Sequence, residues 1–349
     1  MGVFGFVLSG SGVIGVLAGG LLTDLLNWHW IFLVNIPVGI AVYMLSLRLL
    51  PSGTGPAAKG RVDVAGAITV TASLMLAVYA IINANEAGWV SAQTLGLLAV
   101  SAVLLVTFIV IEALISSPLM PLGLFRNRNV STANVLGVLM AAGMFAYFFF
   151  SALYLQLVLE YTPMEVGLAY LPGTIVWGAS SLLLSDRLVM RLGIRKPLLG
   201  GLTLMTLALL LLARTPVDGN WAIDILPATL LIGLGAGVAF NPLLLAAMSG
   251  VAPEQAGLAS GVVNTAFMMG GAVGLAVLVS LADSRTENLL ASGEEQLSAL
   301  NGGYHLAFIV GAIFVVASAA VGAALLRVER PQQAHGEAPD AVPATADAH

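Results

Sequence analysis

The chain offers few side chains that could carry acid–base, nucleophilic or metal chemistry. Enzymes of those kinds need His, Asp, Glu or Cys residues that converge near one site. The 349-residue sequence has no cysteine, so thiolate metal sites and disulfides are excluded. None of its four histidines forms a spaced pair with another: His29, His305, His335 and His349. These observations argue against an enzyme, and we expect neither a metal site nor a cofactor.

The densest group of charged residues lies between positions 185 and 196. It has one block at Asp186 and Arg187 and a second at Arg195 and Lys196. Charge contacts that form in one conformation and break in another suit a gate between moving parts of a protein. The alternative interpretation is that these charges guide membrane topology alone.

The composition of the chain is that of a membrane protein. It is 59% hydrophobic and 9% charged, whereas a soluble domain has about 25% charged residues. Its apolar runs approach the ~20 residues that a helix needs to cross a bilayer. Runs such as 95–111 do not alternate between apolar and polar residues, which excludes barrel strands. The predicted fold class is therefore all-α, a polytopic membrane protein with about ten transmembrane helices.

Apolar runs between loop signals define the expected membrane spans. Pro, Gly and charged residues separate the runs, most clearly at residues 51–61 and 116–132. The ten predicted spans are 2–22, 30–50, 64–84, 94–115, 132–155, 164–185, 197–213, 224–248, 257–282 and 305–327.

The basic residues indicate how these spans are oriented. If the loops alternate between two sides, eleven Lys and Arg residues fall on one side, and Arg214 and Arg285 alone fall on the other. Cytoplasmic loops carry the excess of Lys and Arg. We therefore predict a cytoplasmic location for the basic side and, with an even number of helices, for both termini. The basic side carries Arg48, Lys59, Arg61, Arg126, Arg128, Arg187, Arg191, Arg195, Lys196, Arg327 and Arg330.

The first span contains small residues four positions apart. Ser11, Gly15 and Gly19 share one helix face, and Gly20 lies beside them. Small residues in this spacing let another helix approach closely. Tight packing alone and a seam in a moving transporter both fit the pattern.

Two carboxylates lie at the ends of predicted spans. Asp24 follows the first span, and Glu112 lies near the end of the fourth. Ionisable residues inside a membrane are costly to bury and are usually functional. Because these two lie at span ends, we interpret both as interfacial residues rather than proton carriers.

The residues from 15 to 39 resemble the fifth and sixth helices of a known transporter type. Those are the fourteen-helix drug:proton antiporters of the major facilitator superfamily (the EmrB/QacA type). The sequence departs from that pattern at Ser11, Val16 and His29. It matches the pattern at Gly15, Gly19, Gly20, Trp28, Trp30, Phe32, Asn35, Pro37 and Gly39.

Further segments extend the resemblance over about residues 2–327. Residues 118–126 are similar to the entry to helix nine of that family, and residues 154–172 to its connection between helices nine and ten. Residues 257–274 resemble helix thirteen, with Phe267 and Met268 in place of a commoner Arg-Gln pair. Residues 185–196 resemble the Asp-Arg-x-Gly-Arg-Lys loop of the superfamily. The resemblance therefore implies a cytoplasmic gate at Asp186, Arg187, Arg191, Gly193, Arg195 and Lys196.

The resemblance implies that the ten spans are helices five to fourteen of such a transporter. On this basis we expect a truncated or mis-started gene and a chain that is inactive alone. The expected divisions are the last two helices of the N-terminal bundle (1–50), a linker with an additional helix pair (51–115), a six-helix C-terminal bundle (116–330) and a disordered cytoplasmic tail (331–349). The carboxylate that couples protons is expected in the first helices of the family.

The same architecture implies a substrate cavity lined by polar residues of the fifth, sixth, eighth and ninth spans. An Asn in a membrane helix can equally bond a neighbouring helix. Met and Phe side chains near these spans offer an adaptable apolar surface. The expected cavity residues are Asn134, Tyr147, Gln156, Trp177, Asn241 and Asn264, and the antiporter-like helix motif comprises Gly15, Gly19, Gly20 and Asp24.

These observations together predict a multidrug or small-molecule exporter of the plasma (inner) membrane, driven by proton influx. Its expected partners are the lipid bilayer, a lipophilic substrate and protons, and no basic patch indicates nucleic acid. A membrane sensor or scaffold without transport stays open as an alternative, although no soluble output domain is visible in the sequence. An integral membrane enzyme is the weaker alternative.

Overall fold

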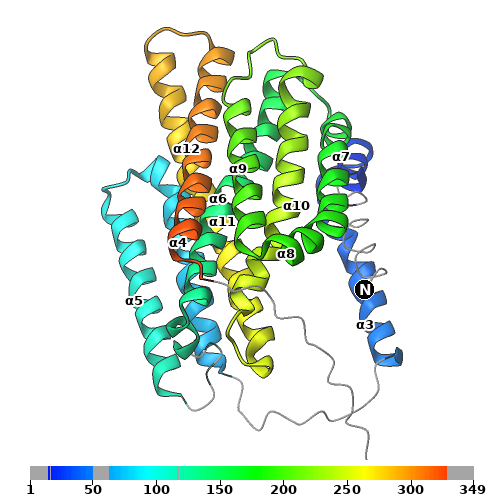
Figure 1. Ribbon diagram of the computed structural model, residues 1–349. Coiled ribbons are helices and arrows are strands. Elements are labelled where there is room, and N and C mark those ends of the chain that lie inside the picture. Colours follow the sequence, from blue (N-terminus) through cyan, green and yellow to red (C-terminus); the bar gives the residue numbers. More distant parts are fainter. Residues whose placement is uncertain are drawn as a thin grey trace, which may run out of the picture.

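The computed structural model of the protein describes residues 15, 17–49, 63–115, 118, 120 and 122–327. Throughout these residues the regular structure is helical, and no strand occurs among them (Figure 1). The all-α prediction is therefore confirmed. The expectations for Ser11, Val16, the linker at 51–62 and the tail at 331–349 lie outside the described residues.

The N-terminal segment has little packing. Residues 17–25 are helical and are followed by α2 (His29–Leu33) and α3 (Asn35–Leu49). No residue of α2 or α3 is buried, although the stretch from His29 to Leu49 is long and apolar enough to cross a membrane. In Figure 1, α3 stands at one edge of the molecule.

The next two helices form a hairpin, α4 (Val64–Ala87) and α5 (Ala92–Leu114). Two reciprocal hydrogen bonds join the helices in the middle of the hairpin. Ser73 Oγ donates to the Ser101 carbonyl, and Ser101 Oγ donates to the Ser73 carbonyl, both at 2.8 Å. Trp89 Nε1 donates to Ser280 Oγ on α11 at 3.1 Å. The hairpin is thus fastened internally and attached to a neighbouring helix.

The remaining helices form one bundle with a continuous apolar core (Figure 1). Its largest fully buried side chains include Tyr147, Tyr154, Phe150 and Phe308. A short 3₁₀ turn, η1 (Leu122–Arg126), precedes it. The bundle comprises α6 (Arg128–Leu153) with η2 (Tyr154–Val158), α7 (Pro163–Ser180) with η3 (Ser181–Ser185), α8 (Asp186–Leu192), α9 (Arg195–Leu212), η4 (Trp221–Ile225) with α10 (Leu226–Met248), α11 (Pro253–Ala291) and α12 (Gln296–Leu325).

Glycine allows α9 and α10 to approach at backbone distance. A Cβ on Gly235 would lie 2.6 Å from the Gly201 carbonyl oxygen, and a Cβ on Gly201 would lie 2.5 Å from the Gly235 carbonyl oxygen. Those separations are too short for any larger residue without movement of the backbone. Small residues at membrane helix interfaces permit such contact, which gains dispersion energy where lipid offers no hydrophobic driving force.

Nine helices of the described part of the chain are long and apolar enough to span a membrane. They match the second to tenth predicted spans, while most of the first predicted span lies outside the described residues. The loop predicted between residues 283 and 304 is longer than the observed one, because α11 continues to Ala291 and α12 begins at Gln296. Hydropathy locates the apolar part of a helix, and α11 extends past that part through polar residues such as Asp283, Arg285 and Glu287.

Candidate functional site

An aromatic cluster lies between α6 and α7. The rings of Tyr147 and Tyr170 meet edge-on with centroids 5.8 Å apart, and Phe148 lies 5.8 Å from Tyr170. Phe148 also lies 6.5 Å from the ring of Trp177. Two of the predicted cavity residues, Tyr147 and Trp177, therefore belong to one cluster through Phe148 and Tyr170.

Hydrogen bonds hold this cluster in one arrangement. The Tyr170 hydroxyl donates to the Phe148 carbonyl at 3.0 Å and lies 2.6 Å from Ser151 Oγ. Ser151 is fully buried, and its hydroxyl donates in turn to the Tyr147 carbonyl. Buried polar groups in an apolar setting are costly unless they are paired, so this network fixes the register between α6 and α7.

A shallow, widely open hollow of about 390 Å³ lies beside the cluster. Its α6 wall follows the i, i+3, i+4, i+7 spacing of one helix face. Gly271 of α11 allows the opposite wall to come close, because a Cβ there would lie 2.6 Å from the Phe145 ring. The lining is wholly apolar and mostly aromatic: Phe145, Phe148, Phe149, Ala152 and Leu153 from α6, with Leu275 from α11.

The other residues predicted to line a cavity are polar, and they do not belong to the aromatic cluster. Asn134 is buried, and its Nδ2 donates to the Val130 carbonyl of its own helix at 2.9 Å. Asn241 Nδ2 lies 3.3 Å from Ser181 Oγ, which ties α10 to η3. Gln156 and Asn264 are exposed.

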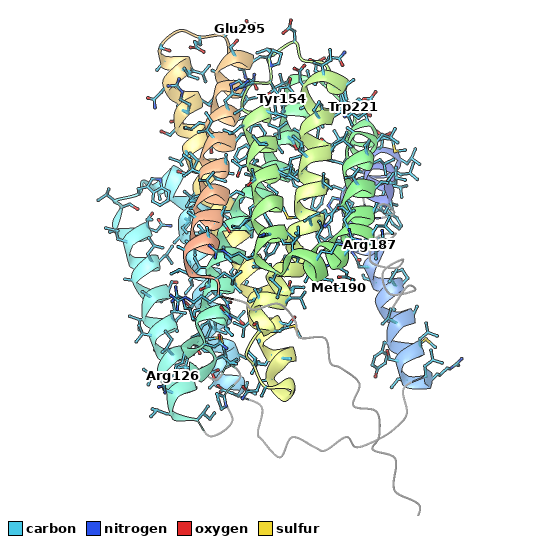
Figure 2. The ribbon with its side chains drawn as sticks, in the orientation of Figure 1. Arg126, Tyr154, Arg187, Met190, Trp221 and Glu295 are labelled. Carbon is cyan, nitrogen blue, oxygen red and sulfur yellow. The ribbon has the colours of Figure 1, made fainter. Side chains whose placement is uncertain are left out.

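The predicted gate residues occupy α8 and the start of α9. The side chains of Asp186, Arg187 and Arg191 are exposed. The helix α8 ends at Leu192, and Gly193 after it has a φ of +78°, which glycine adopts without strain. Among the described residues no ion-pair partner is present for Asp186 in this conformation. Figure 2 shows Arg187 and Met190 on this segment and Arg126 near the same end of the molecule, with Tyr154, Trp221 and Glu295 near the other.

Basic side chains from other helices cap the C-terminus of α12. Arg195 donates through Nη2 to the Ala323 carbonyl. Arg128 Nε donates to the Leu325 carbonyl at 2.9 Å, and Asn129 Nδ2 donates to the Arg327 carbonyl at 3.2 Å. A helix C-terminus has unpaired carbonyls and a partial negative charge, so cations stabilise it. Arg195 is therefore engaged with α12 rather than with Asp186.

The antiporter-like helix motif makes one close contact with the bundle. A Cβ on Gly20 would lie 2.9 Å from the Pro163 carbonyl oxygen at the start of α7. No described residue lies within 4 Å of the corresponding positions on Gly15 and Gly19. Asp24 is exposed. Of the four motif residues, Gly20 is thus the one whose small size the described packing uses.

With this geometry in place, comparison with known proteins settles the family. The sequence profile described as Major Facilitator Superfamily matches residues 1–275. The chain belongs to the Major Facilitator Superfamily. The transporter interpretation is thereby confirmed over the enzyme interpretation at the level of the family, and the chain is a multi-pass membrane protein.

Three curated proteins show to what this chain is similar. The puromycin resistance protein pur8 of Streptomyces alboniger is 35% identical over 324 residues, which cover 90% of this chain and 64% of that protein. The cephamycin export protein CmcT of Amycolatopsis lactamdurans is 33% identical, with 88% and 63% covered. The multidrug transporter MdtP of Bacillus subtilis is 31% identical, with 83% and 53% covered. The chain spans less than two thirds of the length of each.

Glu112, which the sequence analysis places near the end of a span, is buried by its neighbours in the protein. Its side chain is 3% exposed. One oxygen accepts from the Met120 amide at 3.0 Å. The Met120 backbone therefore lies against the last turn of α5, a contact that the position of Glu112 in the sequence does not reveal.

Several residues of the aromatic site were absent from the sequence prediction. Phe145 could have been found, because it shares a helix face with Phe148 and Phe149. Tyr170 and Ser151 pair across two helices, and Leu275 faces the hollow from a third. Those three depend on helix packing, and nothing in their local sequence indicates it.

Proposed function

We propose that the chain forms the substrate-binding part of an exporter for lipophilic small molecules. The aromatic hollow between α6 and α11 supports this proposal most directly. Its volume of about 390 Å³ falls in the range of about 300–1,000 Å³ that small-molecule sites occupy. Phe and Trp rings offer apolar area and faces that attract cations. The names of relatives that confer resistance to, or export, antibiotics agree with such a substrate.

We further propose the fourteen-helix register, in which the ten spans correspond to helices five to fourteen. Residues 15–49 are then the last two helices of the N-terminal bundle, and α4 with α5 are the additional pair. Three observations support this: the motif residues from 15 to 39, the serine hydrogen bonds within the hairpin, and its attachment to α11 through Trp89. In-frame sequence upstream of Met1 that encodes four further apolar helices, one with an acidic residue, would agree with the register.

Transport is proposed to be proton-driven antiport by alternating access, in the inner membrane. The basic end of the bundle is proposed to face the cytoplasm, with both termini there, because the Lys and Arg residues gather on that side. In this proposal the charges of α8 and the start of α9 form a gate in the conformation opposite to the described one. In alternating access, the two opposite conformations interconvert when one helical bundle rocks against the other.

Export assays with matched variants test the substrate site. They need cells that express the gene with any in-frame upstream sequence, loaded with a lipophilic cationic dye. Phe148→Ala and Phe149→Ala remove ring contacts of about 0.5–1.5 kcal/mol each, so we expect a several-fold loss of apparent affinity. Phe314→Ala, on α12 and outside the hollow, is the matched control.

The outcomes separate the parts of the proposal. Normal membrane expression with undiminished export by both Phe variants would remove the hollow as the substrate site. Unchanged export after collapse of the proton gradient would remove the antiport mechanism and leave the site intact. Absence of export by the complete gene product, for every lipophilic compound tried, would favour the sensor or scaffold interpretation.

A further inference from the structure

The span that begins with α7 contains a π turn near the basic end of the bundle. Residues 163–192 form one run of helix through α7, η3 and α8, and the backbone is right-handed helical on both sides of η3. Within η3 the hydrogen bonds follow the i→i+5 spacing of a π-helix instead of i→i+4. In Figure 1, α8 lies across the end of α7 and does not continue in its direction. The π turn is therefore the point at which this span changes direction.

One face of α10 holds α7 as far as the start of this turn. Gly233 and Gly237 lie four residues apart on α10, and thus on the same face of the helix. A Cβ on Gly233 would lie 3.1 Å from the Gly173 carbonyl carbon. A Cβ on Gly237 would lie 2.6 Å from the Trp177 carbonyl oxygen and 3.1 Å from the Ser181 amide nitrogen. The two helices therefore meet at backbone distance up to Ser181, which leaves them little room to move against each other.

Asn241 is the next residue of the same face, four positions after Gly237. Its side chain is half-buried and reaches the π turn. The Asn241 Nδ2 lies 3.3 Å from Ser181 Oγ and 3.4 Å from the Ser181 carbonyl oxygen. Where the glycine contacts end, an amide side chain thus connects α10 to the first residue of η3.

The last residue of η3 carries a hydroxyl that is unpaired among the described residues. Ser185 is fully buried, and its Oγ has no hydrogen-bond partner there. Serine and threonine hydroxyls within α-helices can bond the carbonyl four residues earlier, as Thr206 does with Leu202. For Ser185 that carbonyl belongs to Ser181, which Asn241 contacts instead. Because an unpaired buried hydroxyl costs free energy, an α-helical register at η3 would remove a cost that the π register carries.

We propose that Asn241 is a positioning residue, which holds η3 in the π register and so sets the direction of α8. When its contact with Ser181 is released, η3 returns to the α-helical register and Ser185 Oγ donates to the Ser181 carbonyl. A backbone segment cannot adopt both registers at once, so the element has two discrete states. Elements of this kind can turn a small local change into movement of a whole helix.

The movement falls on the charged end of the span. Asp186, Arg187 and Arg191 are exposed on α8, and a change of register at η3 turns all three about the helix axis. The glycine contacts between α7 and α10 lie before the turn and stay in place. The inference rests on the proposed gate for its role in transport, but the movement of α8 itself is measurable without transport.

Distances between spin labels in the full chain, reconstituted in lipid nanodiscs, test the proposal. The natural sequence has no cysteine, so Met190→Cys on α8 and Leu207→Cys on α9, both exposed, report the position of α8 against the bundle. We expect one main distance in this parent protein and a second, resolved distance in Asn241→Leu, which has no amide donor. Asn134→Leu is the matched control, because the Asn134 amide bonds its own helix, and it should keep the parent distance.

A second substitution separates a change of register from general damage. Ser185→Ala removes the hydroxyl that stabilises the alternative register, so in the Asn241→Leu background it should restore most of the parent distance. Alone, Ser185→Ala should leave the parent distance unchanged. A second label pair, Leu207→Cys with Ile309→Cys on α12, lies on two helices that pack together away from η3. It should report the same distance in every variant.

Three results would overturn the assignment. Equal distances in the parent and in Asn241→Leu would show that the amide does not hold α8. A second distance in Asn241→Leu that persists after Ser185→Ala would exclude the change of register. A second distance of the same population in Asn134→Leu would indicate a general effect of losing a polar side chain. None of these readouts depends on export, so a moving α8 together with undiminished efflux by Asp186→Asn would support the hinge and refute the gate.

Discussion

The hydroxyl of Tyr170 on α7 lies 2.6 Å from Ser151 Oγ on α6, and both residues are buried. This bond and the donation from Tyr170 to the Phe148 carbonyl are the polar connection between the two helices that carry the aromatic cluster. Without the Tyr170 hydroxyl, Ser151 keeps its bond to the Tyr147 carbonyl, so the change costs about the net contribution of one hydrogen bond, about 0.5–1.5 kcal/mol. The cluster thus depends on a pair of hydroxyls as well as on ring packing.

Replacement of Tyr170 by Phe tests that dependence. It keeps the ring and deletes the hydroxyl, so we expect a loss of about 0.5–1.5 kcal/mol of stability. Thermal unfolding of the purified protein in nanodiscs measures the change. Tyr43→Phe, at a side chain that is 66% exposed on α3, is the control and should unfold as the wild type does. Equal unfolding temperatures for both variants would show that the buried bond contributes nothing.

The close approach of α9 and α10 predicts that alanine will have different effects on stability at Gly235 and at Gly200. Gly235→Ala places a methyl group against the Gly201 carbonyl, and overpacking of this kind typically costs about 1–3 kcal/mol. Gly200 lies one residue from Gly201 on α9, and no described residue is within 4 Å of its Cβ position, so Gly200→Ala adds no clash there. It should be neutral or gain up to about 1 kcal/mol from helix propensity. Identical unfolding curves for the two variants would contradict the described helix contact.

The hydrogen bond to the C-terminus of α12 distinguishes Arg195 from the neighbouring Lys196. Arg195→Gln removes the guanidinium that donates to the Ala323 carbonyl, and a charge at a helix C-terminus is worth about 0.3–1 kcal/mol. Hydrogen exchange of the last turn of α12, followed by mass spectrometry, should therefore accelerate by a few-fold. Lys196→Gln removes the adjacent exposed charge and should leave the exchange rate of α12 unchanged. Faster exchange in both variants would indicate a general effect of charge rather than a cap.

The sequence predicted the spans of this fold well because hydrophobicity decides where helices cross a membrane. The span predicted at 64–84 has the same limits as the apolar part of α4. The failures lie outside the apolar regions, where hydropathy carries no signal. Examples are α8, which forms in the predicted loop after Ser185, and the extension of α11 to Ala291.

The candidate site was less accessible to sequence reasoning, since polarity was the criterion for a cavity residue. Asn134 met that criterion, yet its amide bonds its own helix. Phe145 and Leu275 line the hollow and look like ordinary lipid-facing residues in the sequence. Asp63 and Glu112 are 49 positions apart in the sequence, and both lie near Gly66 because of the way the hairpin closes. Such facts require tertiary packing.

The proposed orientation is open to a labelling test. The natural sequence has no cysteine, so a single introduced thiol reports one position. Met190→Cys, 71% exposed on α8, should react with a membrane-permeant maleimide and resist an impermeant one in intact cells. Asp218→Cys, in the exposed loop between α9 and α10, should react with both reagents. The reverse pattern would invert the assignment of the basic end to the cytoplasm.

The gate proposal makes its own prediction for the complete gene product. Asp186→Asn keeps the size and hydrogen-bonding capacity of the side chain but deletes its charge. Acidic residues contribute little to membrane topology, so a purely topogenic role predicts normal dye efflux. A gate that closes through charge contacts in the opposite conformation predicts a sharp fall in efflux at normal membrane expression. Asp218→Asn, outside the charged segment, should export as the wild type does. Undiminished, gradient-dependent efflux by Asp186→Asn would refute the gate, and an equal loss in the control would show that the assay reports general damage.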